Sequence, residues 1–310
     1  MTKFAITFAG QGSQSVGMMT GFADTPIVQR TFEEASEILK QDVWAMITDG
    51  PAELQNQTVN TQPLMLCAGV ATFRAWQDRQ GSAPVYFAGH SLGEYTALVA
   101  AGALAFGDAL RLVRLRAQAM QEAVPEGAGG IAAVLGLDAA QVIAVCLEAA
   151  EGQVLEAVNL NSPGQVVIAG HRAAVERGMA LAKLRGAKRA LMLPMSVPSH
   201  CALMKPAADK LAFALDSIAC NVPVIPVLQN ADVLAFSNTQ DIKQALVRQL
   251  YRPVRWVETI QAISASGATA VVECVPGKVL TGLNKRVDAS LNCIAVSDTA
   301  SLMAAIDATR

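Results

Sequence analysis

The segment that most constrains the fold is a short run of small residues between two apolar stretches. Residues 84–87 (PVYF) precede the run 89–93 (GHSLG), and an Ala- and Leu-rich stretch follows at 96–106. This order predicts a buried strand, a sharp turn and a helix. A G-x-S-x-G sequence in that context holds its serine at the tip of the turn, near free N–H groups of the helix. We therefore predict that Ser91 is a nucleophile; the alternative is a glycine-rich turn with an idle serine.

Composition excludes several functional classes. The chain has 310 residues, of which 52% are hydrophobic and 16% are charged, enough for one large domain or two unequal ones. The net charge is −2, and Lys, Arg, Asp and Glu are spread along the sequence. Aromatic residues make up only 5%. Neither a basic stripe nor a base-stacking surface is indicated, so we expect no nucleic-acid partner.

The apolar runs and the cysteines indicate a cytoplasmic protein. Residues 1–8 are too short and interrupted for a secretory signal, and the apolar run at 96–106 is too short to span a bilayer. Six cysteines are scattered, with no C-x-x-C and no Cys/His ligand spacing. We expect reduced thiols, no metal site and no membrane association.

Strand and helix patterns alternate along most of the chain, which predicts an α/β fold with a mainly parallel sheet covered on both faces. After the glycine-rich stretch 125–130, the pattern becomes β-α-β-β-α-β, the order of a ferredoxin-like unit. We therefore predict a core formed by residues 1–126 and 197–310, with residues 127–196 inserted as a small subdomain.

A serine nucleophile needs a base within hydrogen-bond reach. The chain has three histidines. His90 adjoins the serine, so its side chain points away from the same face of the turn, and His171 follows a strand end in the subdomain. His200, in a turn where the chain re-enters the core, is the base by elimination. Cys201 is a rival nucleophile, although a buried inert thiol is the better interpretation.

Two further features have both a functional and a structural interpretation. The loop Gly10-Gln11-Gly12 follows the first strand but lacks a phosphate-binding lysine, so it either supplies a backbone N–H donor or forms a simple turn. On the helix predicted for 109–122, Arg116 lies roughly 200° from Arg114 and can face inward. A solvated or paired arginine is the usual alternative.

Together these segments resemble malonyl-CoA:acyl-carrier-protein transacylases of bacterial type II fatty acid synthesis. The matching segments run in order along the whole chain and comprise 8–14 (FAGQGSQ), 61–63 (TQP), 89–95 (GHSLGEY), 120–127 (MQEAVPEG), 159–165 (NLNSPGQ), 197–200 (VPSH), 249–254 (QLYRPV) and 276–280 (PGKVL). One departure is Val275, where the family usually has glycine; it adds bulk to a turn near the site.

The resemblance implies a role for each candidate residue. Ser91 attacks the malonyl-CoA thioester, and His200 takes its proton and later protonates the leaving thiol. The N–H groups of Gln11 and Leu92 form the oxyanion hole. Arg116 pairs with the free carboxylate of the malonyl group.

The resemblance also implies that Gln249 orients His200 through its carbonyl, in place of a triad aspartate. The acyl-enzyme then passes malonyl to the phosphopantetheine thiol of acyl carrier protein in a ping-pong reaction that supplies fatty acid elongation. It further implies an α/β-hydrolase-like core, no cofactor and a monomer.

Four alternatives remain at this stage. A serine esterase or thioesterase would need a carboxylate for His200; Asp108 and Asp138 lie between the serine and this histidine, but each opens or caps a helix, and an HGGG loop is missing. The malonyl transferase of malonate decarboxylase shares the chemistry, whereas a polyketide acyltransferase suits a longer chain. An inactive carrier-docking module is disfavoured because Ser91, His200 and Arg116 are all present.

Overall fold

A five-stranded parallel sheet forms the centre of the molecule in the computed structural model, which describes residues 2–194 and 197–310. Its strand order is β7-β2-β1-β8-β9, and every neighbouring pair runs parallel. The strands are β1 (Phe4–Phe8), β2 (Tyr86–Gly89), β7 (Val227–Leu228), β8 (Ala270–Glu273) and β9 (Asn292–Ala295). The mainly parallel α/β sheet expected from the sequence is therefore confirmed.

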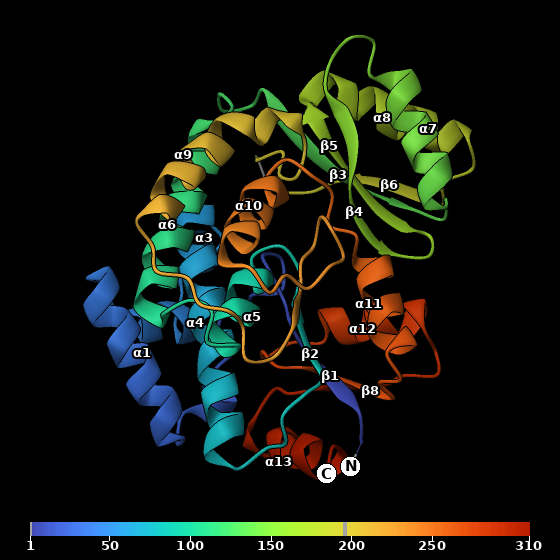
Figure 1. Ribbon diagram of the computed structural model, residues 1–310. Helices are drawn as coiled ribbons and strands as arrows, with labels where there is room; N and C mark the ends of the chain where they lie inside the picture. Colours follow the sequence, from blue (N-terminus) through green and yellow to red (C-terminus); the bar gives the residue numbers. More distant parts are fainter. Residues whose placement is uncertain (1, 195–196) are drawn as a thin grey trace.

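Helices cover this sheet on both sides. In Figure 1, α1, α4, α6 and α9 stack on one side of the core, and α11 and α12 lie on the other. The helices of the core are α1 (Pro26–Leu39), α2 (Val43–Thr48), α3 (Ala52–Gln55), α4 (Thr58–Asp78), α5 (Gly93–Ala100), α6 (Phe106–Glu122), α9 (Lys205–Asp216), α10 (Thr239–Gln249), α11 (Trp256–Ala265), α12 (Val279–Val287) and α13 (Thr299–Ala308), with 3-10 helices η1 (Thr20–Phe22) and η2 (Ala202–Met204).

A second, antiparallel sheet carries its own two helices, visible at the upper right of Figure 1. Its order is β4-β5-β3-β6, and the elements are β3 (Gly129–Leu135), α7 (Ala139–Ala149), β4 (Leu155–Ser162), β5 (Gln165–His171), α8 (Arg172–Leu184) and β6 (Arg189–Met192). Alternation along β5 sends Val166 and Ile168 into one cluster with α7 and α8. Val167 and Ala169 face the other way, in a cluster with Cys201 of the core. This sheet is therefore buried on both faces.

Two helices of the core differ from the sequence-based expectation. The polar residues 58–63 predict a loop before a helix at 64–80, but α4 begins at Thr58 and runs through Pro63. Thr61 and Gln62 are 0% and 1% exposed, so tertiary packing of polar side chains decides the structure here. α5 begins directly at Gly93 and ends at Ala100, whereas the apolar run predicts a helix at 96–106.

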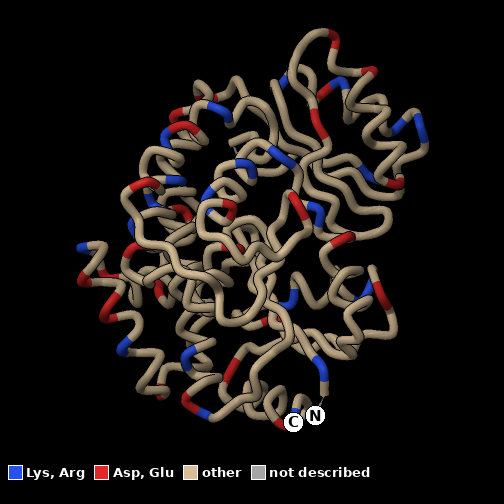
Figure 2. Tube along the Cα trace, in the orientation of Figure 1, with Lys and Arg blue, Asp and Glu red and all other residues tan. Residues whose placement is uncertain are grey.

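Charged residues of both signs are distributed along the described part of the chain. Lys and Arg are interspersed with Asp and Glu on the helices that cover both sheets (Figure 2). The two chain ends meet, where the N–H of Thr2 donates to the carbonyl of Arg310 at 3.4 Å. Within residues 2–194 and 197–310, none of the helices is long and apolar enough to cross a membrane.

Candidate active site

The turn between β2 and α5 holds Ser91 in the left-handed region, at φ 52°. Both glycines of its G-x-S-x-G sequence are required by close packing. A Cβ on Gly89 would lie 1.9 Å from the carbonyl carbon of Gly93, and a Cβ on Gly93 would lie 2.0 Å from the carbonyl oxygen of Phe8. Only glycine fits at either position, so the motif is a physical condition for this turn.

The loop after β1 lies beside this turn. A Cβ on Gly10 would lie 2.3 Å from the carbonyl oxygen of His90, so glycine is needed for the approach. In the described part of the chain, the N–H groups of Gln11 and Leu92 donate to no protein acceptor. The loop and the start of α5 thus leave two backbone donors free beside Ser91, the arrangement that an oxyanion hole requires.

Ser91 and His200 form a hydrogen-bonded pair. The Ser91 Oγ lies 2.7 Å from Nε2 of His200, and Nδ1 of the same ring lies 2.7 Å from the carbonyl oxygen of Gln249. A carbonyl only accepts, so Nδ1 carries the hydrogen and Nε2 is free to accept one. Burial, and secondly the charge of Arg116, lower the pKa of His200 to about 3. The imidazole is therefore neutral at physiological pH and able to take a proton.

Arg116 enters the same site from α6 and is 1% exposed. Its Nη1 donates to Oε1 of Gln62 at 2.8 Å, and its Nη2 donates to Oε1 of Gln249 at 3.0 Å. Nη2 of Arg116 also lies 3.4 Å from Ser91 Oγ. The buried Nε of Arg116 has no hydrogen-bond partner in the described structure. These partners are neutral, and no salt bridge joins Arg116 to a carboxylate among the described residues.

The buried carboxyl of Glu94 lies near this arginine, and its burial weakens its ability to compensate the Arg116 charge. Burial is the main reason that the pKa of Glu94 rises to about 8, with opposing hydrogen bonds from Asn230 and Gln249. At neutral pH this carboxyl is mostly protonated. Arg116 is consequently a buried cation whose hydrogen-bond partners are all neutral, next to the candidate nucleophile.

These groups open into a cleft of about 510 Å³ between the two sheets. The core contributes Gln11, Ser91, Arg116 and His200, and the antiparallel sheet contributes Ile131, Asn161 and Val167, among others. The Nε2 of His90 lies 2.8 Å from Oδ1 of Asn161 and links the two walls. The cleft brings every sequence-predicted site residue except the buried Gln249 to its surface, and Gln249 contacts three of them from behind.

Comparison with known proteins accounts for this geometry. A family model described as an acyl transferase domain matches residues 6–301. The chain belongs to the acyl transferase domain family. It is 55% identical to the malonyl CoA-acyl carrier protein transacylase of Escherichia coli K12, covering 99% of this chain and all of that protein. It is 44% identical to the enzyme of the same name from Bacillus subtilis, over 99% and 97% of the two chains.

Solved structures agree with the family assignment. An acyl carrier protein S-malonyltransferase from Vibrio cholerae superposes with a TM-score of 0.96 at 54% identity, over 98% of this acyl transferase and all of the other chain. A malonyl-transacylase in complex with its type II PKS acyl-carrier protein superposes with a TM-score of 0.98 at 52% identity, over 99% and 100%. The mixed α/β architecture is thus shared with malonyltransferases.

The residues set aside in the sequence have structural roles in this acyl transferase. The Nδ1 of His171 accepts a hydrogen bond from the N–H of Val154 at 3.0 Å, far along the chain from the serine. The Sγ of Cys201 is buried and donates to the carbonyl of Pro198 at 3.1 Å. Burial raises the pKa of this thiol to about 12, so it is not a competing nucleophile.

Sequence reasoning missed Gln62, Glu94 and Asn230, all buried polar residues that contact the site. Gln62 and Glu94 lie within segments that carry the family resemblance, which is the one signal that pointed to them. Asn230 lies outside those segments, and a single asparagine after a short strand has no distinguishing pattern.

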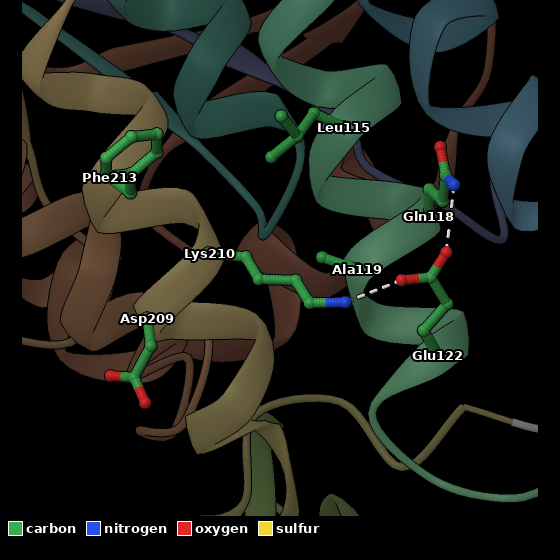
Figure 3. Close-up of a pocket in the computed structure, with 7 residues that line it drawn as sticks. All are labelled: Leu115, Gln118, Ala119, Glu122, Asp209, Lys210 and Phe213. Carbon is green, nitrogen blue, oxygen red and sulfur yellow. Dashed lines mark hydrogen bonds and ion pairs between the residues drawn. The ribbon is translucent and has the colours of Figure 1, made fainter.

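A second hollow lies on the outer face of α6, between α6 and α9 (Figure 3). Its walls comprise Leu115, Gln118, Ala119 and Glu122 of α6 and Asp209, Lys210 and Phe213 of α9. The Nζ of Lys210 lies 2.6 Å from a carboxylate oxygen of Glu122 and bridges the two helices. We call this hollow the α6–α9 groove.

Proposed function

We propose that this chain transfers the malonyl group from malonyl-CoA to the phosphopantetheine thiol of acyl carrier protein, through a malonyl ester on Ser91. The observation that carries this proposal is the buried guanidinium of Arg116, which has no salt bridge among the described residues and whose Nη2 lies 3.4 Å from Ser91 Oγ. A cation in that place favours an acyl group that ends in a carboxylate. The names of relatives at 55% and 44% identity support the same substrate and acceptor.

The first half-reaction forms the malonyl ester. Ser91 Oγ attacks the thioester carbonyl carbon while its proton passes to Nε2 of His200, 2.7 Å away. The carbonyl oxygen becomes an oxyanion that the N–H groups of Gln11 and Leu92 stabilise. When the intermediate collapses, the C–S bond breaks, and His200 returns the proton to the sulfur of coenzyme A.

The second half-reaction runs the same steps in reverse with a different thiol. His200 takes the proton of the phosphopantetheine thiol, and the sulfur attacks the ester carbonyl. The C–O bond to Ser91 breaks, and the proton on His200 passes to the serine oxygen. The Nδ1 bond to the Gln249 carbonyl keeps the ring in one tautomer throughout both halves.

Arg116 fixes the distal end of the acyl group. We propose that its guanidinium binds the malonyl carboxylate bidentately, with Gln62 and Gln249 holding the guanidinium plane. The position of Arg116 at the cleft, with Nη2 3.4 Å from Ser91 Oγ, supports this proposal.

We also propose the finer architecture expected from the sequence: an α/β-hydrolase-like core of residues 1–126 and 197–310, with a ferredoxin-like subdomain at 127–196. The β-α-β-β-α-β order and the strand order β4-β5-β3-β6 support the second unit. We further propose that the chain acts as a cytoplasmic monomer without a cofactor, because the nucleophile, base, cation and oxyanion donors are all groups of the chain itself.

The experiment that tests the function is intact-mass spectrometry after mixing the protein with malonyl-CoA. We expect one malonyl adduct on the wild type, a faint adduct with acetyl-CoA, and none on Ser91→Ala. Adding holo acyl carrier protein should discharge the adduct onto the carrier. Steady release of coenzyme A without an adduct, and without any transfer to the carrier, would instead make water the acceptor and the protein a thioesterase.

A further inference from the structure

A buried asparagine behind the serine turn is not used by the reaction steps above. Asn230 follows β7 and is 0% exposed. Its Nδ2 donates to the carbonyl of Gly89 at 2.6 Å, and its Oδ1 accepts from the N–H of Ser91 at 2.7 Å. One side-chain amide therefore bridges the two backbone groups on either side of His90.

The asparagine itself is fixed on its other side. Its N–H donates to Oε2 of Glu94 at 2.6 Å, and its carbonyl accepts from the N–H of Arg255 at 3.1 Å. Every polar atom of Asn230 thus has a protein partner. Because Glu94 lies in the first turn of α5 and Arg255 immediately precedes α11, Asn230 is connected to two further elements of the core.

This bridge has two consequences for the nucleophile. Ser91 has a left-handed backbone, φ 52°, which is unfavourable for serine and persists where the surroundings impose it. In addition, the N–H of Ser91 is occupied by Asn230, whereas that of Leu92 donates to no described protein acceptor. The amide therefore determines which N–H of the turn remains available for an oxyanion.

We propose that Asn230 is a positioning residue for acyl transfer, whose side-chain amide holds the serine turn so that Ser91 Oγ and the Leu92 N–H face the same carbonyl. This inference rests on the proposed function of Ser91. Asn230 contacts no reacting atom and acts through the backbone of the turn. Among the described residues it has no hydrogen bond to Arg116 or His200, so its effect is separable from substrate binding.

The first test is Asn230→Ala, with rapid-quench measurement of malonyl-enzyme formation. We expect the rate constant at saturating malonyl-CoA to fall about 100-fold, the usual loss for a misplaced nucleophile or oxyanion donor. The dissociation constant of malonyl-CoA should change less than about threefold, because Arg116 is untouched. The exposed Asn221→Ala is the matched control and should retain the wild-type rate constant.

Amplitude and rate separate positioning from folding. A residue with only a structural role would reduce the fraction of molecules that acylate, while those that remain would react at the wild-type rate constant. That result for Asn230→Ala would overturn the proposal. A weakened malonyl-CoA affinity with an unchanged rate constant would overturn it as well.

A second variant keeps the test decisive if Asn230→Ala does not fold. In Asn230→Asp, the ionised carboxylate accepts from Ser91 but repels the Gly89 carbonyl, whereas the protonated carboxyl donates to it. The rate constant relative to wild type should rise at least about tenfold as the pH falls through the pKa of this new carboxyl. Glu94 and Arg255 hydrogen-bond to Asn230, and His90 lies between the two backbone groups that its amide bridges. Asp232, two residues further on, pairs with Arg248. All of these ionisable groups are present in both proteins. A ratio that stays constant with pH would contradict the proposal.

The wild type distinguishes this inference from the proposed function. If wild-type protein forms no malonyl adduct, the function of Ser91 is wrong. If wild type forms the adduct and both Asn230 variants form it at the wild-type rate constant, only the positioning role is wrong.

Discussion

Charged side chains on the two faces of helix α6 have opposite environments. On the outer face, Glu122 pairs with Lys210 across the α6–α9 groove, and their side chains are 46% and 55% exposed (Figure 3). On the inner face, one and a half turns earlier, Arg116 is 1% exposed and contacts only neutral amides, a hydroxyl and the ring of Tyr95. The solvated Lys210 therefore has a carboxylate partner, whereas the buried guanidinium of Arg116 has none in the described structure.

This difference supports the proposal that Arg116 binds an anion from outside the chain. A solvated charge is stabilised by water, so its ion pair contributes little and is easily replaced. A buried guanidinium has lost that water, and neutral hydrogen bonds compensate it only in part. A protein built only for stability would place a carboxylate there, as it does on the outer face. We propose that the inner face instead keeps Arg116 available for a carboxylate from outside the chain.

The substitution expected to have the largest effect is Arg116→Ala, which removes the buried cation from the inner face. We expect the acylation rate with malonyl-CoA, measured as kcat/KM, to fall about 10²–10⁴-fold, since losing one partner of a buried pair costs roughly 3–5 kcal/mol. Acylation with acetyl-CoA, which has no carboxylate, should stay equal or improve. Equal losses for both acyl groups would show that the arginine is structural. Arg116→Lys keeps the charge without the planar fork and should recover only part of the malonyl rate.

A smaller effect is expected from placing a carboxylate beside Arg116 on the inner face, as Glu122 already lies beside Lys210 on the outer face. In Gln62→Glu, the new carboxylate takes the place of the Oε1 that accepts from Arg116 Nη1 at 2.8 Å. An internal partner should compete with the substrate and reduce kcat/KM for malonyl-CoA about 10–100-fold. The selectivity for malonyl over acetyl should fall with it.

Gln118→Glu is the control for that experiment, because it adds the same charge on the exposed outer face of α6, whereas Gln62 lies on α4 and faces Arg116. Its kcat/KM should remain within about twofold of wild type, as expected for a solvated charge. A similar loss in both variants would mean that added negative charge on α6 or its neighbours is harmful wherever it lies.

The sequence predicts the frame of the site better than its interior. The serine turn follows from the glycines, because Gly89 and Gly93 are demanded by contacts of 1.9 and 2.0 Å. The inward direction of Arg116 follows from helical geometry, and His200 follows from elimination. Their assignment as a reacting set also used the family resemblance, and their roles remain predictions.

Buried amides and carboxyls were beyond that reasoning for a physical reason. Gln62 and Asn230 have no periodicity, and their importance comes from partners 54 and 139 residues away in the sequence. The polar start of α4 likewise predicts a loop, although Thr61 and Gln62 are buried in the helix and Gln62 contacts Arg116. In each case the structure depends on tertiary hydrogen bonds, which the local sequence pattern does not indicate.

The pH dependence of acylation tests how the buried charge of Arg116 affects the pKa of His200. Because burial and the Arg116 charge lower the pKa of His200 to about 3, its imidazole stays neutral well below pH 6.5, and Nε2 remains free to accept a proton. With acetyl-CoA, the wild-type acylation rate at pH 5 should lie within about twofold of that at pH 7. Removing the nearby cation makes the imidazolium easier to form, so the acid limb of Arg116→Ala should move upward in pH. An acid limb near pH 6.5 in both proteins would contradict this electrostatic coupling.

The smallest effect is expected on the outer face, from Lys210→Ala. The Lys210 hydrogen bond is the first cause of the lowered pKa of Glu122, but both side chains are largely solvated. We expect kcat/KM to stay within about twofold and the melting temperature to fall by at most about 2 °C, with the difference vanishing in 1 M salt. Differential scanning calorimetry at two salt concentrations measures this directly. A loss of malonyl selectivity in Lys210→Ala would show that the two faces of α6 are coupled, and the inner guanidinium would then depend on the outer pair.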